Sequence, residues 1–182
     1  MALAASAGGL NAVSQVVSGL PASFPAAILV VQHLDPNHRS LMADILRRRT
    51  SLQVKQAEEG DRLQPGTIYI ARPNYHLIVN RQGNLSLTQS ETVHFLRPSA
   101  DLLFESVADS YQEQAIAVVL TGTGHDGTRG VKAIKEKGGT VITQDQESSD
   151  FFGMPSAAIE TGVVDFVLPL AEVSATLISL VT

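Results

Sequence analysis

The sequence predicts an α/β protein in which a doubly wound, mostly parallel sheet carries helices on both faces, a Rossmann-like arrangement of three layers. Continuous apolar runs such as residues 26–31 and 115–120 are typical of strands buried on both faces of a parallel sheet. Segments with apolar residues at helical spacing separate these strands, and such alternation indicates a doubly wound sheet. Only the middle of the chain departs from the alternation, and there we expect an antiparallel hairpin.

The first half begins with a short apolar run and a turn of small residues, Ala4-Ala5-Ser6-Ala7-Gly8-Gly9-Leu10. A helix is predicted over residues 10–19, because its apolar residues recur at helical spacing and Gly19 and Pro21 end it. The buried strand 26–31 ends at Gln32-His33, and a helix over 40–49 and a strand over 52–57 follow.

The middle of the chain carries turn signals at Gly60-Asp61 and Pro65-Gly66. Three short strands are predicted over residues 67–71, 76–79 and 85–88. Residues 80–84 join the last two strands, which we therefore expect to form the hairpin.

The second half returns to alternation. Ser99 is the expected N-cap of a helix, and the strand 115–120 runs directly into a glycine-rich loop, residues 121–127. The remaining elements are predicted as a helix over 131–137, a strand over 140–143, a helix over 154–161, a strand over 163–168 and a helix over 170–180.

Length and composition favour one domain over residues 1–182, since 182 residues with 44% hydrophobic content can bury a substantial core. The chain has no cysteine, which excludes disulfides and thiolate chemistry. It also has no apolar run of about 18 residues or more, so we expect no membrane insertion and a cytoplasmic location.

The net charge of −5 is unevenly distributed, with +2 over residues 1–91 and −7 over residues 92–182. Much of the early positive charge lies in Arg47-Arg48-Arg49. This cluster is either a solvated helix end or a site that helps to dock an acidic partner. Because the sequence has no wider basic surface and only 5% aromatic residues, we expect no binding to nucleic acid.

Three predicted strands end in polar residues that could act together. Ser6 follows the first strand, His33 the second, and Asp126 lies in the loop after Leu120. In doubly wound sheets reactive groups gather beyond the carboxyl ends of the strands. A serine, a histidine and a carboxylate supply a nucleophile, a base and an orienting anion. Each residue also has a structural interpretation: Ser6 as a helix cap, His33 as an ordinary strand-end residue and Asp126 as a turn residue.

The loop Thr121-Gly122-Thr123-Gly124 is a candidate oxyanion site, because glycines let backbone N–H groups approach a reacting carbonyl closely. Thr123 and Gly124 are the residues we select there. The alternative is a loop that only turns sharply.

With these residues in place, the sequence resembles the catalytic domain of the CheB family of chemotaxis receptor methylesterases. The matching segments follow the order of the family over nearly the whole chain, which is more specific than any one motif. They are Ser6-Ala7-Gly8-Gly9, Val30-Val31-Gln32-His33, Glu58-Glu59-Gly60-Asp61, Tyr69-Ile70-Ala71, Arg97-Pro98-Ser99 with Asp101-Leu102-Leu103-Phe104, Leu120-Thr121-Gly122 with Gly124, Asp126-Gly127 and Gly153-Met154-Pro155.

The resemblance implies that Ser6 is the nucleophile, His33 the general base and Asp126 the residue that orients it, on an α/β fold whose hairpin sits on an otherwise parallel sheet. It implies hydrolysis of glutamate γ-methyl esters on the cytoplasmic helices of methyl-accepting chemotaxis receptors, without a cofactor or metal. Whether receptor glutamines are also deamidated stays open. We further expect Arg97 to help hold the acidic receptor segment, with a loop-bonding role as the alternative.

Several positions depart from the common family pattern. Ala4 and Ala7 stand where many members have glycine and threonine, and Thr123 stands where methionine is usual. These motifs look more like the variant in which the esterase is fused to a receptor methyltransferase. We therefore expect a domain excised from a longer chain that carries a response-regulator or methyltransferase domain.

The same residues allow three other interpretations. A dinucleotide site at Gly8-Gly9 would need an acidic residue near the second strand end, where Gln32-His33 stands. A metal site through His33, Asp35 and His38 lacks a clear further ligand. A weakly active or inactive receptor-binding module of the same fold stays open. Three remaining histidines, His76, His94 and His125, are expected to be exposed or to lie behind the site.

Overall fold

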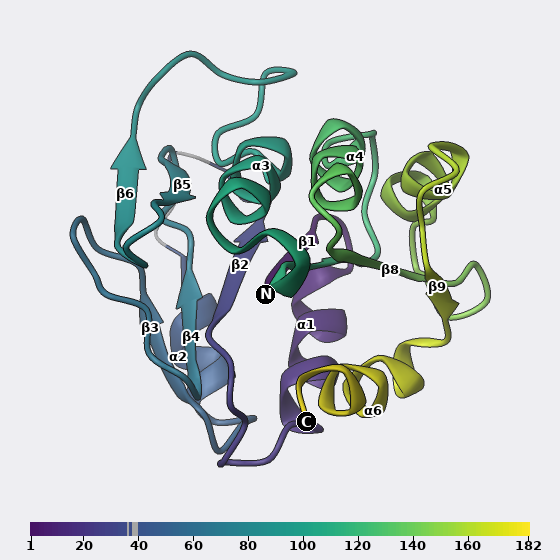
Figure 1. Ribbon diagram of the computed structural model, residues 1–182, viewed down its shortest axis with the longest axis horizontal. Coiled ribbons are helices and arrows are strands. Elements are labelled where there is room, and N and C mark those ends of the chain that lie inside the picture. The colour runs from purple at the N-terminus through teal and green to yellow at the C-terminus, as the bar shows by residue number, and fades with distance from the viewer. Residues whose placement is uncertain (36, 38–39) are drawn as a thin grey trace.

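The computed structural model describes residues 1–35, 37 and 40–182. Its main sheet has seven parallel strands in the order β3-β4-β2-β1-β7-β8-β9 (Figure 1). The strands are β1 (Ala2–Ala5), β2 (Ile28–Gln32), β3 (Gln53–Gln56), β4 (Thr67–Ile70), β7 (Ile116–Val119), β8 (Thr140–Gln144) and β9 (Phe166–Leu168). The parallel sheet predicted from the apolar runs is confirmed.

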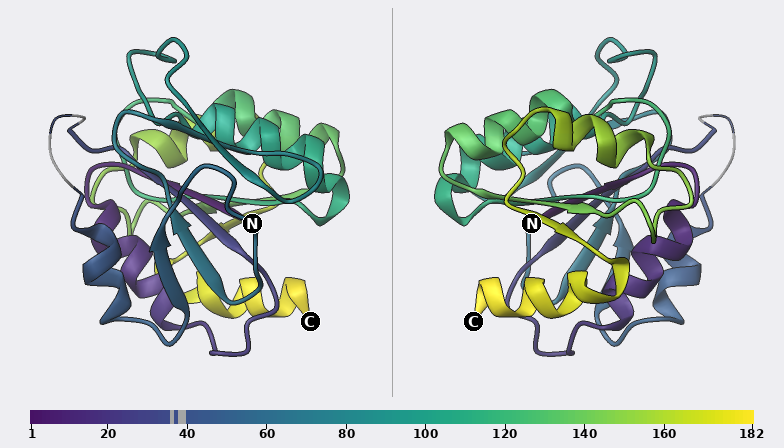
Figure 2. Two further views of the ribbon diagram at one scale, coloured as in Figure 1. Left: turned by 90° about the vertical axis from the view of Figure 1, so that its left-hand side faces the viewer. Right: turned by 90° about the vertical axis from the view of Figure 1, so that its right-hand side faces the viewer.

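Helices cover both faces of this sheet, which gives the predicted three layers (Figure 2). One face carries α1 (Gly9–Ser18), α2 (Met42–Arg47) and α6 (Leu170–Val181), and the other carries α3 (Ala100–Tyr111), α4 (Thr128–Glu136) and α5 (Gly153–Glu160). Side chains of β1 alternate between the two cores: Leu3 and Ala5 pack on the α1 side, Ala2 and Ala4 on the α3 side. β1 is therefore the buried centre of the molecule.

The hairpin is a separate two-stranded antiparallel sheet of β5 (His76–Val79) and β6 (Leu85–Thr88). Leu77, Val79 and Leu85 are buried against the core on the α3 side. The hairpin thus packs on α3, and β4, which precedes it, belongs to the parallel sheet between β2 and β3.

Some element boundaries differ from the prediction. Helix α4 begins at Thr128 rather than at residue 131, because Gly127 turns the chain with φ 105° directly before it. Strand β9 begins at Phe166 rather than at residue 163, and Asp165 precedes it with its carboxylate accepting the N–H of Val141. Helix α2 covers only Met42–Arg47 of the ten residues predicted.

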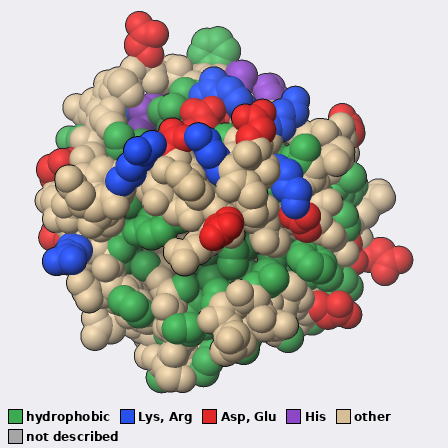
Figure 3. All heavy atoms as spheres, in the orientation of Figure 1, with side chains coloured by type: hydrophobic (Ala, Val, Ile, Leu, Met, Phe, Trp, Pro, Cys, Tyr) green, Lys and Arg blue, Asp and Glu red, His purple; other side chains and the backbone are tan. Residues whose placement is uncertain are grey.

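Charged side chains gather over the layer of α3 and α4 at the top of Figure 3. Many of these charges are paired: Arg129 with Glu105, and Lys137 with Asp109 at 3.3 Å. The structure thus balances charge internally on that face.

Candidate active site

The candidate site lies where the strand order reverses. The chain runs from β1 to β2 on one side and later returns to β7 on the other, so the carboxyl end of β1 is the topological switch point of the sheet. Ser6 follows β1 there, and its N–H donates to the carbonyl of Thr121 at 3.0 Å. The β1–β2 register ends with Ala5 paired to Gln32, and the N–H of His33 donates to the carbonyl of Ala5 at 3.0 Å, so Ser6 and His33 follow the ends of two adjacent strands.

His33 and Asp126 are 93 positions apart in the sequence and form a direct contact. His33 Nε2 lies 2.8 Å from Asp126 Oδ2, and the two side chains are only 9% and 1% exposed. A carboxylate accepts hydrogen bonds, so Nε2 carries the proton and Nδ1 carries a lone pair. This arrangement orients the imidazole and leaves one nitrogen able to accept a proton.

The Asp126 carboxylate also accepts three hydrogen bonds from the start of α3. Ser99 Oγ donates at 2.9 Å, Ala100 N at 2.6 Å and Asp101 N at 3.1 Å. Ser99 is the N-cap residue of α3, as predicted, but its side chain makes no capping bond to the helix. The Asp126 carboxylate accepts the first N–H groups of α3 instead, and the Ser99 hydroxyl donates to Asp126. A carboxylate at a helix N-terminus is further favoured by the helix dipole.

These contacts set the charge of Asp126. Burial acts to raise the pKa of its carboxyl group, but the hydrogen bonds from His33, Ala100 and Asp101 outweigh burial and hold the pKa below its ordinary value. The pKa of the neighbouring Asp101 is shifted in the opposite direction. Burial and the nearby Asp126 charge raise the pKa of the Asp101 carboxyl despite a hydrogen bond from Gly130 N. The surroundings therefore favour the ionised form of the Asp126 carboxyl more than that of the Asp101 carboxyl.

Gln32 is a residue of the site that the sequence analysis did not select. Its Nε2 donates to the carbonyl of Ser6 at 2.7 Å and to that of His33 at 3.2 Å, so one amide ties together the two strand ends. Gly9 makes room for it, since a Cβ there would lie 2.1 Å from Gln32 Oε1. The signal was available in the motif Gln32-His33, where a polar residue ends an apolar strand.

Around Ser6, backbone N–H groups are available for a developing negative charge. Among the residues that the structure describes, the N–H groups of Ala7, Thr123 and Gly124 have no hydrogen-bond partner, and neither has the Ser6 hydroxyl. Gly122 brings the loop close, because a Cβ at this position would lie 2.8 Å from the Cβ of Ser6. The 121–124 loop thus lies against the serine, as an oxyanion site requires.

Arg97 holds the loop that leads from β6 into α3. Its guanidinium donates to Asn74 Oδ1 at 2.8 and 3.0 Å and to the carbonyls of Gln89 and Ser90 at 3.0 and 2.8 Å. This contact set corresponds to the loop-bonding alternative given for Arg97.

The remaining histidines lie behind or beside the site. His76 is buried and accepts the N–H of Ser99 on Nδ1 at 3.2 Å, so it supports the residue that holds Asp126. His94 and His125 contact each other edge to face, with ring centroids 4.6 Å apart. None of the three contacts His33 in the described part of the chain.

The metal interpretation included His38, which lies outside the described residues. Within the described residues, no group of three acidic or histidine side chains is arranged to hold a metal ion. In the same part of the chain, no helix has the length and apolar character needed to cross a bilayer.

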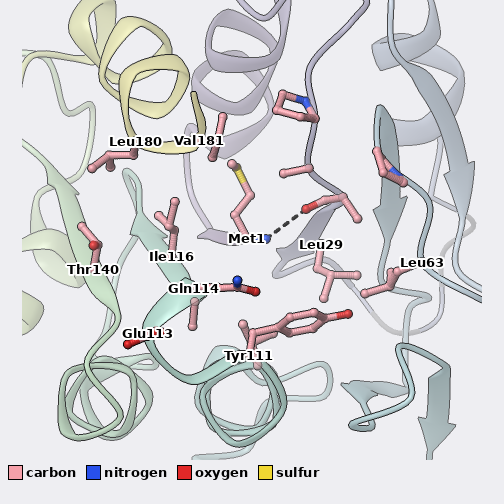
Figure 4. Close-up of a pocket in the computed structure, with 16 residues that line it drawn as sticks. Met1, Leu29, Leu63, Tyr111, Glu113, Gln114, Ile116, Thr140, Leu180 and Val181 are labelled. Atoms are coloured by element: carbon pink, nitrogen blue, oxygen red, sulfur yellow. Dashed lines mark hydrogen bonds between the residues drawn. The ribbon is translucent and has the colours of Figure 1, made fainter.

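Two cavities lie at opposite ends of the strands of the parallel sheet. The larger, of about 620 Å³, lies at the amino-terminal ends of the parallel strands, where the amino group of Met1 donates to the carbonyl of Ala27 at 2.9 Å (Figure 4). None of Ser6, His33 and Asp126 lines it. The second, of about 510 Å³, is lined by Ser6, Gly8, Gly9 and Gln32 together with residues of α1 and α2. Of these two cavities, the second adjoins the candidate nucleophile.

Known proteins are similar in sequence to nearly the whole of this chain. The family model described as CheB methylesterase matches residues 1–177. A protein of Leptospira interrogans named putative protein-glutamate methylesterase/protein-glutamine glutaminase is 38% identical over 169 residues, which cover 93% of this chain and 88% of that protein. A protein-glutamate methylesterase of Myxococcus xanthus is 42% identical over 97% of this chain and 53% of its own length.

A solved structure gives the same result. The crystal structure of the Thermotoga maritima CheB methylesterase catalytic domain superposes with a TM-score of 0.95 at 39% identity, covering 99% of this chain and 97% of that one. The full-length Thermotoga protein is about twice as long, since this chain covers 53% of it. The family match over nearly the entire chain and the shared fold lead to one conclusion: this chain belongs to the CheB methylesterase family.

Proposed function

We propose that this protein is a protein-glutamate methylesterase, in which Ser6 hydrolyses glutamate γ-methyl esters on methyl-accepting chemotaxis receptors with the help of His33 and Asp126. One observation carries the proposal: His33 and Asp126 are in hydrogen-bond contact at 2.8 Å beside Ser6, at the switch point of a CheB-family sheet. Its substrate helices are cytoplasmic, and the enzyme acts there.

The reaction proceeds by acyl transfer. Ser6 Oγ attacks the ester carbonyl carbon while His33 Nδ1 takes the hydroxyl proton, and Asp126 stabilises the imidazolium that forms. The free N–H groups of Ala7, Thr123 and Gly124 donate to the oxyanion. When the C–O bond to the methoxy group breaks, His33 returns the proton and methanol leaves. Water then attacks the acyl-enzyme with His33 as base, which gives glutamate and free Ser6.

Deamidation of a receptor glutamine follows the same route, with ammonia instead of methanol as the leaving group. Relatives are named for both activities. We extend the proposal to glutamine deamidation by the same three residues.

The organisation of the parent protein stays a prediction. We propose that residues 1–182 act as one catalytic domain, with a response-regulator or methyltransferase domain as its regulatory partner in a longer chain. The CheB relatives that are about twice as long leave room for such a domain.

A direct role of Arg97 in substrate binding also stays a prediction. Replacing Arg97 with Ala should raise KM for methylated receptor more than it lowers kcat if the guanidinium contacts the acidic segment. A fall in thermal stability with unchanged kinetics in the folded fraction would assign Arg97 to the loop alone, through its bonds to Asn74, Gln89 and Ser90.

The test of the proposed function is methanol release from a methylated receptor cytoplasmic fragment. We expect the wild-type protein to release methanol and Ser6→Ala to release none above background, while both have the same circular dichroism spectrum. A folded wild-type protein that binds the fragment without releasing methanol would contradict the proposal and favour a receptor-binding module.

A further inference from the structure

The cavity beside Ser6 has an apolar wall formed largely by α2 and its neighbours. Leu10, Leu34, Leu41, Met42 and Ile45 line it. Leu41 is 58% exposed and Leu34 is 40% exposed, although both are large apolar side chains. Apolar side chains that stay exposed around a concave site beside a reactive group are typical of a binding surface.

The same face of α2 ends in two unpaired cations. Leu41 is the N-cap residue of α2, Ile45 lies within the helix and Arg48 is its C-cap residue, so these three follow one another at intervals of four and three residues along one side. Arg49 comes directly after the C-cap. The guanidinium group of Arg47 donates hydrogen bonds to Asp44 Oδ1 at 2.6 Å and to the carbonyl of Val54 at 2.9 Å. Among the described residues, the side chains of Arg48 and Arg49 have no hydrogen-bond or ion-pair partner, and both are exposed.

We propose that this strip, Leu41, Ile45, Arg48 and Arg49, together with the cavity beside Ser6, is the docking surface for the substrate helix. The inference rests on the proposed function and adds the chemistry of the recognised segment. The occupant is an amphipathic helix of a receptor that carries an apolar residue within one turn of the methylated glutamate and acidic residues one to two turns away.

The dimensions of the strip support this occupant. Ser6 lines the cavity, so a glutamyl ester whose carbonyl reaches the serine brings its own helix against the wall formed by Leu41 and Ile45. Arg48 and Arg49 directly follow Arg47, the last residue of α2, so they lie at the end of the helix beyond Ile45. Acidic residues one to two turns from the ester then lie opposite the two guanidinium groups. On the face formed by α3 and α4, by contrast, Arg129 is paired with Glu105 and Lys137 with Asp109.

The experiment uses two helical peptides, each with one glutamyl γ-methyl ester and a leucine one turn away. One peptide carries glutamates one to two turns from the ester on both sides, and the other carries lysines at the same positions. Affinity is measured by fluorescence anisotropy with Ser6→Ala, so that binding is read without turnover. Turnover is measured with the wild-type active site as kcat/KM for each peptide, divided by kcat/KM for a small methyl ester.

We expect the acidic peptide to bind about tenfold more tightly than the lysine peptide at low salt, with the difference falling as salt is added. The double variant Arg48→Glu/Arg49→Glu should reverse this preference. Leu41→Asp should lower the affinity for both peptides. Lys132→Glu is the matched control, because Lys132 is an exposed lysine of α4 on the other side of the sheet. It should leave the preference unchanged.

Equal affinity for the two peptides, or an equal effect of Lys132→Glu and the double arginine variant, would overturn the proposal. So would self-association of the protein that the double arginine variant abolishes, because the strip would then bind a second copy. If the small ester is not hydrolysed by Ser6, the proposed function fails, and the binding measurements still decide the docking surface.

Discussion

The candidate site depends on three side chains with unequal roles. Ser6→Ala removes the nucleophile and His33→Ala removes the base, so each should lower kcat by a factor of about 10³ or more. Asp126→Asn should leave more activity than either, because the amide still accepts hydrogen bonds at the α3 terminus but orients the imidazole less well. Methanol release from methylated receptor measures all three variants.

Thermal unfolding is the control for these variants. Ser6 and His33 contribute their side chains to no part of the core, so their alanine variants should unfold near the wild-type temperature. Losses of activity that only follow losses of folded protein would count against the assigned roles.

Asp126 should make the stability of the fold depend on pH in the acidic range. Hydrogen bonds hold the pKa of its carboxyl below the unfolded-state value of about 3.9, so the ionised form stabilises the native state. This contribution is complete above the unfolded pKa and is lost as the pH falls through the lower, native pKa. Below that pH range, the difference in unfolding free energy between wild type and Asp126→Asn should be smaller than at pH 7.

The measurement is urea unfolding of wild type and Asp126→Asn across this range. Glu147→Gln serves as the control, since Glu147 is an exposed carboxylate on the β8–α5 connection. A difference in unfolding free energy between wild type and Asp126→Asn that stays constant from neutral pH to the acid limit would contradict the assigned ionisation.

At the scale of elements, the site depends on how closely α3 and α4 approach each other. A Cβ added at Gly130 of α4 would lie 2.6 Å from Phe104 Cβ and 3.2 Å from Asp101 Cα on α3. Gly130→Ala should therefore push the two helices apart and destabilise the protein by about 2 kcal/mol. Because Asp126 accepts hydrogen bonds from the start of α3 and lies two residues before α4, the change should also lower kcat.

Chemical denaturation and kinetics of Gly130→Ala test this coupling, with Lys132→Ala on the exposed face of α4 as the control. Stability equal to wild type would show that the close contact does not constrain the helices.

The order of the elements could be predicted because their signals are local. Apolar runs identified the strands of the parallel sheet, and glycines and prolines marked most of their limits. The prediction missed the start of α4, because Gly127 and Thr128 carry no apolar periodicity. The helix begins at Thr128 because Gly127 adopts a left-handed backbone conformation directly before it.

At the scale of the whole molecule, the sequence predicted which strand ends meet but not the side-chain contacts between segments far apart in the chain. Ser6, His33 and Asp126 were selected because each follows a strand, and strand ends converge in a wound sheet. The cap of α3 by Asp126, and the amide of Gln32 across Ser6 and His33, depend on side-chain geometry between segments far apart in the chain. The motif Gln32-His33 marks Gln32 as a polar residue at a strand end, but no local pattern specifies which groups its amide contacts.

The central claim is that Ser6 is the nucleophile of this fold, and covalent labelling tests it most directly. The wild-type protein is treated with a serine-directed phosphonate ester, digested and analysed by mass spectrometry. We expect one adduct, located on Ser6, that is absent in Ser6→Ala and forms far more slowly in His33→Ala. An adduct on another residue, or methanol release by Ser6→Ala at the wild-type rate, would contradict it.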